Sequence, residues 1–302
     1  MTPTKTVNHN FKSGFVVIAG APNSGKSTLL NRLLGEKISI TSDKPQTTRN
    51  RILGVLHLEN AQCVLIDTPG IHKASGPLNT KMVEVALSSF QDADIILLLV
   101  DATTSGKDAH QTLLKALETQ NKPVVLALNK IDLMKKEALL ALISKWSQMM
   151  NFTEIIPISA ATGDQVPVLI NSLKGLLPDG PPFFPEDSLT DVSERFIAAE
   201  LIREKIFRLT GQEIPYSVAV TVDQFSENPK ATLVTIHATI HVEKESQKGI
   251  IIGKSGVKLK RIGEEARAGI ERLLNTKVFL KLFVRVEKNW SRDAKSLAKF
   301  GY

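Results

Sequence analysis

Cysteine and the larger aromatic residues are scarce in this chain of 302 residues. It has one cysteine, Cys63, two tryptophans and two tyrosines, and aromatic residues make up 5% of the sequence. A single cysteine excludes an intrachain disulfide, which suits a reducing compartment such as the cytoplasm. The folded state must therefore depend on buried apolar side chains, which a hydrophobic content of 42% can supply.

Long apolar runs are also missing. The longest aliphatic run, Ile95–Val100, is six residues long, whereas a membrane-spanning helix needs about 20. Met1–Asn10 is polar and shows no apolar signal region. We expect a soluble, monomeric protein of the cytoplasm, and leave open a peripheral contact with the inner face of the cell membrane.

Positive charge is concentrated near the end of the chain. The net charge is +7, yet residues 251–302 alone hold 13 basic and 5 acidic residues. Residues 151–200 have the opposite balance, with 2 basic and 8 acidic residues. A local basic block favours a site for a polyanion, although a solvated charged helix face would give the same count.

The stretch Gly20–Thr28 fits the phosphate-loop pattern G-x-x-x-x-G-K-[ST] at every required position. A short apolar strand is expected before it, at Phe15–Ala19, and an apolar helix after it, at Thr28–Leu34. Backbone N–H groups of such a loop, together with the N-terminus of the helix, form an anion site. Lys26 is expected to reach the outer phosphates and Ser27 to ligate Mg²⁺.

Strands and helices alternate through the first part of the chain, which predicts a mainly parallel sheet with helices on both faces. The expected strands are Phe15–Ala19, Arg49–Glu59, Gln62–Ile66, Asp94–Val100, Pro123–Leu128 and Glu154–Ile158, with Asn60-Ala61 at a hairpin turn. The expected helices are Thr28–Leu34, Leu78–Phe90, Lys107–Gln120, Lys135–Met150 and Val166–Leu177. Ile38–Thr48 is expected to be a mobile loop.

Four prolines within Pro178–Pro185 cannot continue a helix or a central strand. We therefore expect a domain at 1–178, a stiff linker at 179–189 and a second domain at 190–302. The second domain is predicted to be a small α+β unit of order α-β-β-α-α-β. Its expected elements are Asp191–Leu209, Tyr216–Val222, Thr232–Val242, two helices within Gly249–Leu274, and Val278–Val286.

The tetrapeptide Asn129–Asp132 indicates guanine rather than adenine. The Asp132 carboxylate can accept hydrogen bonds from the ring N–H and the exocyclic amine of guanine, whereas adenine offers neither donor there. A mismatch of this kind can reject a ligand by about 10⁴-fold. Asn129 and Lys130 are expected to hold the base and its loop, and Ser159-Ala160 to present the Ala160 N–H to guanine O6.

Asp67–Gly70 fits the pattern D-x-x-G, in which the aspartate holds Mg²⁺ and the glycine N–H meets the γ-phosphate. Thr48 is the candidate for a further Mg²⁺ ligand, with Thr47 left open as the alternative. We expect Lys26, Thr48, Asp67 and Gly70 to act in catalysis, and Ser27, Thr48 and Asp67 to bind the metal. The expected nucleotide contacts are Gly20, Asn23, Ser24, Gly25, Lys26, Ser27, Thr28, Thr47, Thr48, Asp67, Gly70, Asn129, Lys130, Asp132, Ser159 and Ala160.

In this order, the motifs resemble those of the translation-factor class of GTPases over residues ~14–177. One departure bears on the rate: Ile71 stands where Ras-type proteins have a water-orienting glutamine. The resemblance thus implies slow intrinsic hydrolysis assisted by another group, an ion or a partner. Asn23 resembles the asparagine of potassium-activated relatives, so K⁺ is one candidate.

A second Gly-Lys-Ser occurs within Gly253–Gly256, but it is no phosphate loop, because Lys248 stands where that pattern requires glycine. G-x-x-G between two helices, inside the order α-β-β-α-α-β, resembles a type II KH domain, which clamps a single-stranded nucleic acid. The expected RNA-binding residues are Gly253, Lys254, Ser255, Gly256, Lys258, Lys260 and Arg261.

A phosphate-loop GTPase followed by a KH domain resembles the Era family over essentially the full chain. The residues that carry this likeness include Gln46–Arg49, Asp67–Gly70, Pro215–Val218 and Phe300–Tyr302. The resemblance implies a GTPase that binds the 3′ end of small-subunit ribosomal RNA and assists maturation of the 30S subunit. A phosphate-loop ATPase or kinase and a membrane-associated signalling GTPase are the alternatives; Asp132 opposes the first.

Overall fold

The computed structural model describes residues 11–42, 44, 47–71, 76–104, 108–211, 214, 217–228 and 232–302, and for residues 108–110 and 228 the backbone alone. Contacts divide this part of the chain into two compact units. The first unit contains residues up to 36, residues 50–71 and residues 82–191. The second contains the described parts of 37–49 and 76–81, and residues 192–302. Expectations for Met1–Asn10, Gln46, Pro215 and Tyr216 lie outside the described residues.

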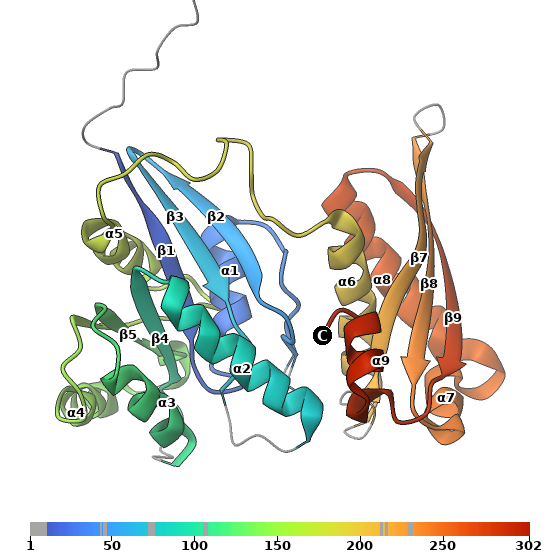
Figure 1. Ribbon diagram of the computed structural model, residues 1–302, viewed down its shortest axis with the longest axis horizontal. Coiled ribbons are helices and arrows are strands. Elements are labelled where there is room, and N and C mark those ends of the chain that lie inside the picture. The colour runs from blue at the N-terminus through green and yellow to red at the C-terminus, as the bar shows by residue number, and fades with distance from the viewer. Residues whose placement is uncertain are drawn as a thin grey trace, which may run out of the picture. The chain divides into compact units, whose positions relative to one another are not determined.

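The described strands of the first unit form one six-stranded sheet of order β2-β3-β1-β4-β5-β6 (Figure 1). The strands are β1 Lys12–Ala19, β2 Ile52–Leu58, β3 Ala61–Asp67, β4 Ile95–Asp101, β5 Val124–Asn129 and β6 Glu154–Pro157. β2 runs antiparallel to β3, and every other neighbouring pair is parallel. The expected mainly parallel α/β sheet is confirmed.

Helices cover both faces of this sheet. They are α1 Lys26–Leu34, α2 Pro77–Asp92, α3 Asp108–Glu118, α4 Lys136–Ser147 and α5 Val166–Leu176. One core cluster joins Val17 of β1 to Phe90 of α2, Leu113 of α3 and Trp146 of α4. α1 lies on the opposite side of the sheet from α2 (Figure 1). Because β1, β3, β4, β5 and β6 run parallel, their carboxyl ends lie together at one edge of the sheet, where α/β sheets bind ligands.

Several boundaries in this unit differ from expectation; β1, for example, begins at Lys12 rather than at Phe15, and two of the differences have a visible cause. β2 begins at Ile52 rather than at Arg49, because Arg49 is buried in the second unit, where its guanidinium donates to the Val218 carbonyl at 2.8 Å. The hairpin turn is at Glu59-Asn60, and Ala61 is already the first residue of β3. Asn60 takes the left-handed conformation, with φ of 56°, which asparagine tolerates better than alanine does.

The proline-rich segment expected at 179–189 is held against the first unit along its length. Val55 N–H donates to the Leu189 carbonyl at 2.8 Å, and Gly180 N–H donates to the Phe11 carbonyl at 3.0 Å. The buried side chain of Gln62 accepts from Phe183 N–H at 2.7 Å and donates to the Phe184 carbonyl at 2.8 Å. The boundary between the units follows Asp191.

The second unit contains a three-stranded sheet of order β7-β8-β9, formed by Ala219–Asn228, Leu233–Val242 and Lys277–Val286. β7 pairs antiparallel with β8, with a register shift between Val222 and Gln224, and β8 pairs parallel with β9. Its helices are α6 Glu194–Leu209, α7 Glu245–Ile252 and α8 Val257–Leu274, with α9 Ala294–Lys299 after the sheet. The expected order α-β-β-α-α-β is confirmed.

β7 extends to Asn228, beyond the expected strand end at Val222, and two further features of this unit were not predicted. α7 begins at Glu245, four residues earlier than expected, because the Gln247 side chain accepts from the N–H groups of Glu243 and Lys244 at 2.9 and 3.0 Å. The C-terminal tail is also folded. Trp290, 1% exposed, has ring neighbours in Phe300 at 5.2 Å and Tyr302 at 5.9 Å.

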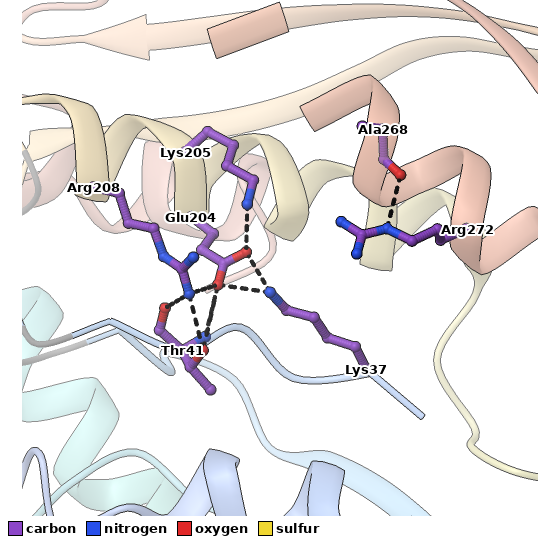
Figure 2. Close-up of polar contacts among 7 residues, drawn as sticks. All are labelled: Lys37, Thr41, Glu204, Lys205, Arg208, Ala268 and Arg272. Atoms are coloured by element: carbon purple, nitrogen blue, oxygen red, sulfur yellow. Dashed lines mark hydrogen bonds and ion pairs between the residues drawn. The ribbon is translucent and has the colours of Figure 1, made fainter. Parts of the chain in front are cut away.

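The described part of segment 37–49, which contains the loop expected to be mobile at Ile38–Thr48, packs on α6 within the second unit. Figure 2 shows the buried carboxylate of Glu204 receiving ion pairs from Lys37 and Arg208, both at 2.7 Å, and from Lys205 at 3.4 Å. Burial acts to raise the pKa of Glu204, but the three cations hold it below its usual value. Arg203, fully buried, donates to the Thr47 carbonyl. The described residues of this segment are therefore anchored by charge.

Candidate functional site

Glycine is required at two points of the phosphate loop, which joins β1 to α1. Gly25 is the N-cap of α1, with φ of 99°, and a Cβ there would lie 2.3 Å from Nδ2 of Asn129. A Cβ on Gly20 would lie 2.3 Å from the Leu99 carbonyl oxygen. Because glycine has no side chain to cap the helix, the first N–H groups of α1 point to where a phosphate can bind.

Lys26 is buried, and its Nζ donates to the loop carbonyls of Ala21 at 2.9 Å and Gly20 at 3.2 Å. Burial lowers its pKa to about 8, and attraction to Asp67 partly opposes the shift. The amine is thus poorly solvated and loses its proton more easily than an ordinary lysine. A phosphate anion in the loop would favour the charged form.

Ser27 and Asp67, two predicted magnesium ligands, are in contact. The Ser27 hydroxyl donates to Oδ2 of Asp67 at 2.7 Å. Because the hydroxyl proton is directed at the carboxylate, the serine oxygen keeps lone pairs that can bind a metal. A hydroxyl oxygen and a carboxylate are the hard ligands that suit Mg²⁺, so these residues fit the ion.

The D-x-x-G segment begins at Asp67, the last residue of β3, and packs on the phosphate loop. A Cβ on Gly70 would lie 2.7 Å from both N and Cα of Pro22, so a side chain is excluded. Ile71 N–H donates to the Gly20 carbonyl at 3.1 Å, and the Ile71 side chain is buried in the core cluster beside α2 and α3. The residue at the position of the Ras-type glutamine is therefore directed into the core.

Asn129 joins the phosphate loop to the loop after β6. Its Nδ2 donates to the Ser24 carbonyl at 2.8 Å, and its Oδ1 accepts from Ala160 N–H at 2.9 Å. The sequence predicted that Asn129 holds the base and its loop, and that the Ala160 N–H meets guanine O6. In this structure the two are bonded to one another, and Asn129 is 2% exposed. Ser159, also predicted to contact guanine, is fully buried, and its hydroxyl accepts from Thr162 N–H at 3.1 Å.

Lys130 and Asp132 extend from the carboxyl end of β5 into a short 3-10 helix, Ile131–Leu133. Lys130 has φ of 69° and forms an ion pair with Asp101 at 2.6 Å. Burial opposes ionisation of Asp101, but hydrogen bonds from Lys130 and Thr103 lower its pKa. Asp132 is exposed, and its carboxylate can therefore meet a ligand.

Two residues of this site were missed from the sequence. Arg32 of α1 donates to the carbonyls of Ala160, at 3.2 Å, and Ala161, and so holds the loop that carries the Ala160 N–H. Asp101 ends β4 in register with Asn129 of β5. The sequence did carry a signal for Asp101, because it is a polar residue at the end of a buried strand that neighbours the strand ending in Asn129. It carried no signal for Arg32.

The other predicted residues are placed as follows. Asn23 is in the phosphate loop with φ of 63°, and Thr28 is in the first turn of α1. Thr47 and Thr48 belong to the second unit, in segment 37–49. Thr48 is buried, and the Thr47 hydroxyl donates to the Lys44 carbonyl at 2.7 Å. Their role as magnesium ligands stays a prediction.

The predicted RNA loop, Gly253–Gly256, separates α7 from α8. Gly253 and Gly256 have φ of 72° and 79°, and Ser255 also lies in the left-handed region at 51°. A Cβ on Gly253 would lie 2.7 Å from Cβ of Lys258, whereas a Cβ on Gly256 would meet open space. Exposed apolar side chains flank the loop: Ile250 before it and Val257 after it.

The basic residues around this loop remain available to a polyanion. Lys254 is exposed in the loop. Lys260 and Arg261 form surface ion pairs with Glu264 at 3.9 Å and Glu265 at 2.9 Å. Such exposed pairs contribute about 0–1 kcal/mol each, so they can be exchanged for phosphate contacts at little cost.

Known proteins resemble the chain in both units. Residues 15–130 match the family described as 50S ribosome-binding GTPase, and residues 213–291 match the KH domain family. "GTPase Era" of Geotalea uraniireducens is 58% identical over 292 residues, covering 97% of this chain and 98% of that protein. The chain belongs to the Era family.

Solved Era structures show the same fold. Era of Aquifex aeolicus, a single-residue variant bound to GDP·AlF₄⁻, matches with a TM-score of 0.93 and 41% identity, covering 97% of this chain and 99% of that one. Era in complex with MgGDPNP and nucleotides 1506–1542 of 16S ribosomal RNA matches with the same TM-score, identity and coverage. The expected architecture, a GTPase domain followed by a KH domain, is confirmed.

Among the described residues, none of the helices combines the length and apolar character needed to span a membrane.

Asn129 gives a test of the site that needs no ligand. Asn129→Ala removes both hydrogen bonds and leaves the buried Ala160 N–H unsatisfied, so the free energy of unfolding should fall by about 2–4 kcal/mol. Asp132→Ala, at an exposed position of the same motif, should change it by less than about 0.5 kcal/mol. Urea unfolding of the nucleotide-free proteins measures both. Equal stability of the two variants would show that Asn129 does not join the loops.

Proposed function

We propose that this protein binds and hydrolyses GTP with Mg²⁺ and binds the 3′ end of 16S ribosomal RNA to assist assembly of the small ribosomal subunit. The main support is the combination of a pre-formed phosphate loop in one unit with an exposed G-x-x-G loop in the other, in a chain of the Era family. The RNA target is carried over from the Era complex that contains nucleotides 1506–1542.

The phosphate end of GTP is assigned to the phosphate loop, with Lys26 on the outer phosphates and the N–H groups of Gly25, Ser27 and Thr28 around them. Gly20, Asn23 and Ser24 complete the loop. Bound Mg²⁺ would neutralise charge on the phosphate oxygens. Ser27 and Asp67 would hold it, since their oxygen atoms are already adjacent at 2.7 Å. Thr48, with Thr47 as the alternative, is the proposed third ligand, and Gly70 N–H is assigned to the γ-phosphate.

The guanine end is assigned to Asp132, Lys130 and the loop around Ser159 and Ala160. The exposed carboxylate of Asp132 is free to accept two hydrogen bonds from the base. We infer that Asn129 acts mainly by holding Ser24 and Ala160 in place, since both of its amide atoms are already used by the protein.

Hydrolysis is expected to be slow without assistance, because buried Ile71 cannot orient water. Unassisted small GTPases turn over at about 10⁻⁴–10⁻³ s⁻¹, and a supplied positive charge can raise the rate by about 10³–10⁵-fold. K⁺ beside Asn23 is our candidate for that charge; an RNA-bound partner state is the alternative.

The RNA clamp is assigned to Gly253, Lys254, Ser255 and Gly256, with Lys258, Lys260 and Arg261 adding charge from α8. The two glycines of the loop adopt positive φ and carry no side chain, so a phosphate can approach the backbone closely. We further propose that the protein works as a monomer in the cytoplasm with the 30S subunit as partner; a peripheral membrane contact stays a prediction.

Base selectivity tests the guanine assignment. Asp132→Asn should lower GTP affinity by about 10²-fold or more and favour xanthine nucleotides, whose exocyclic oxygen accepts where the guanine amine donates. Competition between GTP and XTP measures the switch, and Asp187→Asn, at another exposed carboxylate, serves as the control. If Asp132→Asn keeps the GTP affinity of the wild type, the assignment is wrong.

Lys26 predicts a pH dependence. With a pKa of about 8, about half of the nucleotide-free molecules carry a neutral amine at pH 8. Phosphate binding favours the charged amine, so GTP binding at pH 8 should take up about half a proton, and affinity should fall as pH rises further. Calorimetry in two buffers of different ionisation enthalpy measures the uptake. Lys26→Arg, which stays charged, is the control; an absence of uptake in the wild type would contradict the burial of this amine.

Potassium dependence is tested by single-turnover hydrolysis in K⁺ and in Na⁺. We expect the wild type to be faster in K⁺ by about 10-fold or more. Asn23→Gly should lose this difference, and glycine is chosen because it keeps the left-handed backbone, with φ of 63°, that alanine would strain. Equal wild-type rates in both salts would remove potassium from the mechanism.

The RNA clamp is best tested at Gly256. Gly253→Asp would collide with Lys258, whereas the space beside Gly256 is open. Gly256→Asp should weaken binding of the 1506–1542 RNA by about 10-fold or more through repulsion of phosphate, with GTP binding unchanged. Gly256→Asn, of the same shape without the charge, is the matched control. Normal RNA binding by a folded Gly256→Asp protein would refute the KH assignment.

A further inference from the structure

The face of the KH sheet that points away from α8 carries an alternating row of basic and aromatic side chains. In β9, Lys277, Phe279, Lys281, Phe283 and Arg285 occupy every second position and all are exposed. Residues two apart share a face of a strand. The other face is turned toward α8, since a Cβ on Gly263 would lie 3.5 Å from Leu282.

Three rings form a line on this face. His237 of β8 has its ring centroid 6.4 Å from that of Phe279 and 6.4 Å from that of Phe283, edge-on to both. The residues of β8 that pair with the two phenylalanines are the small Thr235 and Thr239. The phenylalanine rings are therefore not covered from that strand: Phe279 is 52% and Phe283 45% exposed.

Positive charge surrounds the rings. Lys281 pairs with His237 in register and places its Nζ 5.1 Å from the Phe283 centroid. Lys277 and Arg285 flank the row along β9. Asp223 belongs to β7, and its carboxylate accepts from the hydroxyl of Thr239 in β8 at 2.6 Å. The β8–β9 side of the face is thus basic and aromatic.

The position of this surface suits an RNA that has passed the G-x-x-G loop. β9 is the edge strand of the sheet and contacts α7, the helix that precedes the loop. The exposed large apolar side chains described in the second unit gather at two places: Ile250 and Val257 beside the loop, and Phe279 and Phe283 here. Rings that stack bases, set between cations that meet phosphates, are how sheets hold single-stranded RNA.

We propose that the sheet face formed by His237, Lys277, Phe279, Lys281, Phe283 and Arg285 is a second RNA platform. Phe279 and Phe283 stack unpaired bases, and the three cations contact the phosphates between them. The platform extends the footprint of the G-x-x-G loop on the same RNA, so this inference rests on the proposed RNA-binding function. Its contribution is tolerant of base identity, because every base presents a stacking surface.

The main test compares the affinity of full-length variants for fluorescein-labelled 1506–1542 RNA. Stacking on one ring corresponds to about 5- to 150-fold in affinity. The double variant Phe279→Ala/Phe283→Ala should therefore bind at least about 10-fold more weakly, with GTP binding and circular dichroism unchanged. Leu140→Ala, at an exposed apolar position of α4 in the first unit, should bind RNA as the wild type does. Lys281→Ala should flatten the salt dependence of log K by about 0.7.

A direct readout comes from Phe279→Trp. Trp146 and Trp290 are buried, 5% and 1% exposed, so an added tryptophan at position 279 would dominate any quenching by RNA. The variant should bind with near wild-type affinity, and its fluorescence should be quenched when RNA binds. Leu140→Trp should show no such change.

The outcomes separate the platform from the clamp. If the double variant binds RNA with wild-type affinity and Phe279→Trp shows no quenching, the platform is overturned. Weaker RNA binding by Gly256→Asp would still uphold the clamp in that case. RNA binding that neither change weakens would overturn both. Sedimentation tests the alternative that a second copy of the chain binds this face. If the wild type self-associates, the double variant does not, and RNA affinity is unchanged, the face is assigned to a second copy of the chain instead.

Discussion

Two hydrogen bonds of the buried Asn129 side chain, one donated by Nδ2 and one accepted by Oδ1, connect the parts of the nucleotide site. They join the Ser24 carbonyl of the phosphate loop to the Ala160 N–H of the loop after β6. The same side chain excludes any Cβ at Gly25, where α1 begins. Asn129, at the end of β5, therefore positions the phosphate loop after β1 and the loop after β6 relative to each other. Arg32 strengthens this arrangement by holding the Ala160 carbonyl from α1.

Much of this organisation could be predicted from the sequence because the signals are local. Each motif follows an apolar strand, and parallel strands bring their carboxyl ends to one edge. This reasoning predicted the glycines of the phosphate loop, and it predicted that Ser27 and Asp67 belong to one site. What the sequence could not show depends on residues distant along the chain. Asn129 was expected to hold the base and its loop, but its partners, Ser24 and Ala160, could not be named because only folding brings them to it. The proline-rich segment was expected to be a linker, yet Gln62 binds it to the sheet.

The second unit gives a similar lesson. Alternation of apolar residues predicted the inner faces of its strands, and G-x-x-G predicted the clamp. The outer face of β9 carried an equally regular pattern, Lys-Phe-Lys-Phe-Arg at every second position, but its meaning depended on His237 lying between the two phenylalanines in register. The described residues of segment 37–49 lie outside any helix or strand. Their anchoring to α6 relies on an ion pair of Lys37 with Glu204 and on a hydrogen bond from Arg203 to the Thr47 carbonyl, each between residues more than 150 positions apart in the chain.

The central claim is that one chain combines a GTP site with a clamp for the 3′ end of 16S ribosomal RNA. Ultraviolet crosslinking of the wild-type protein to RNA in cells, followed by sequencing of the bound fragments, tests it most directly, with Gly256→Asp processed in parallel. The account predicts that wild-type fragments concentrate at the 3′ end of 16S ribosomal RNA and that the variant loses this concentration. Fragments spread over unrelated RNAs, or an unchanged pattern in the variant, would contradict it.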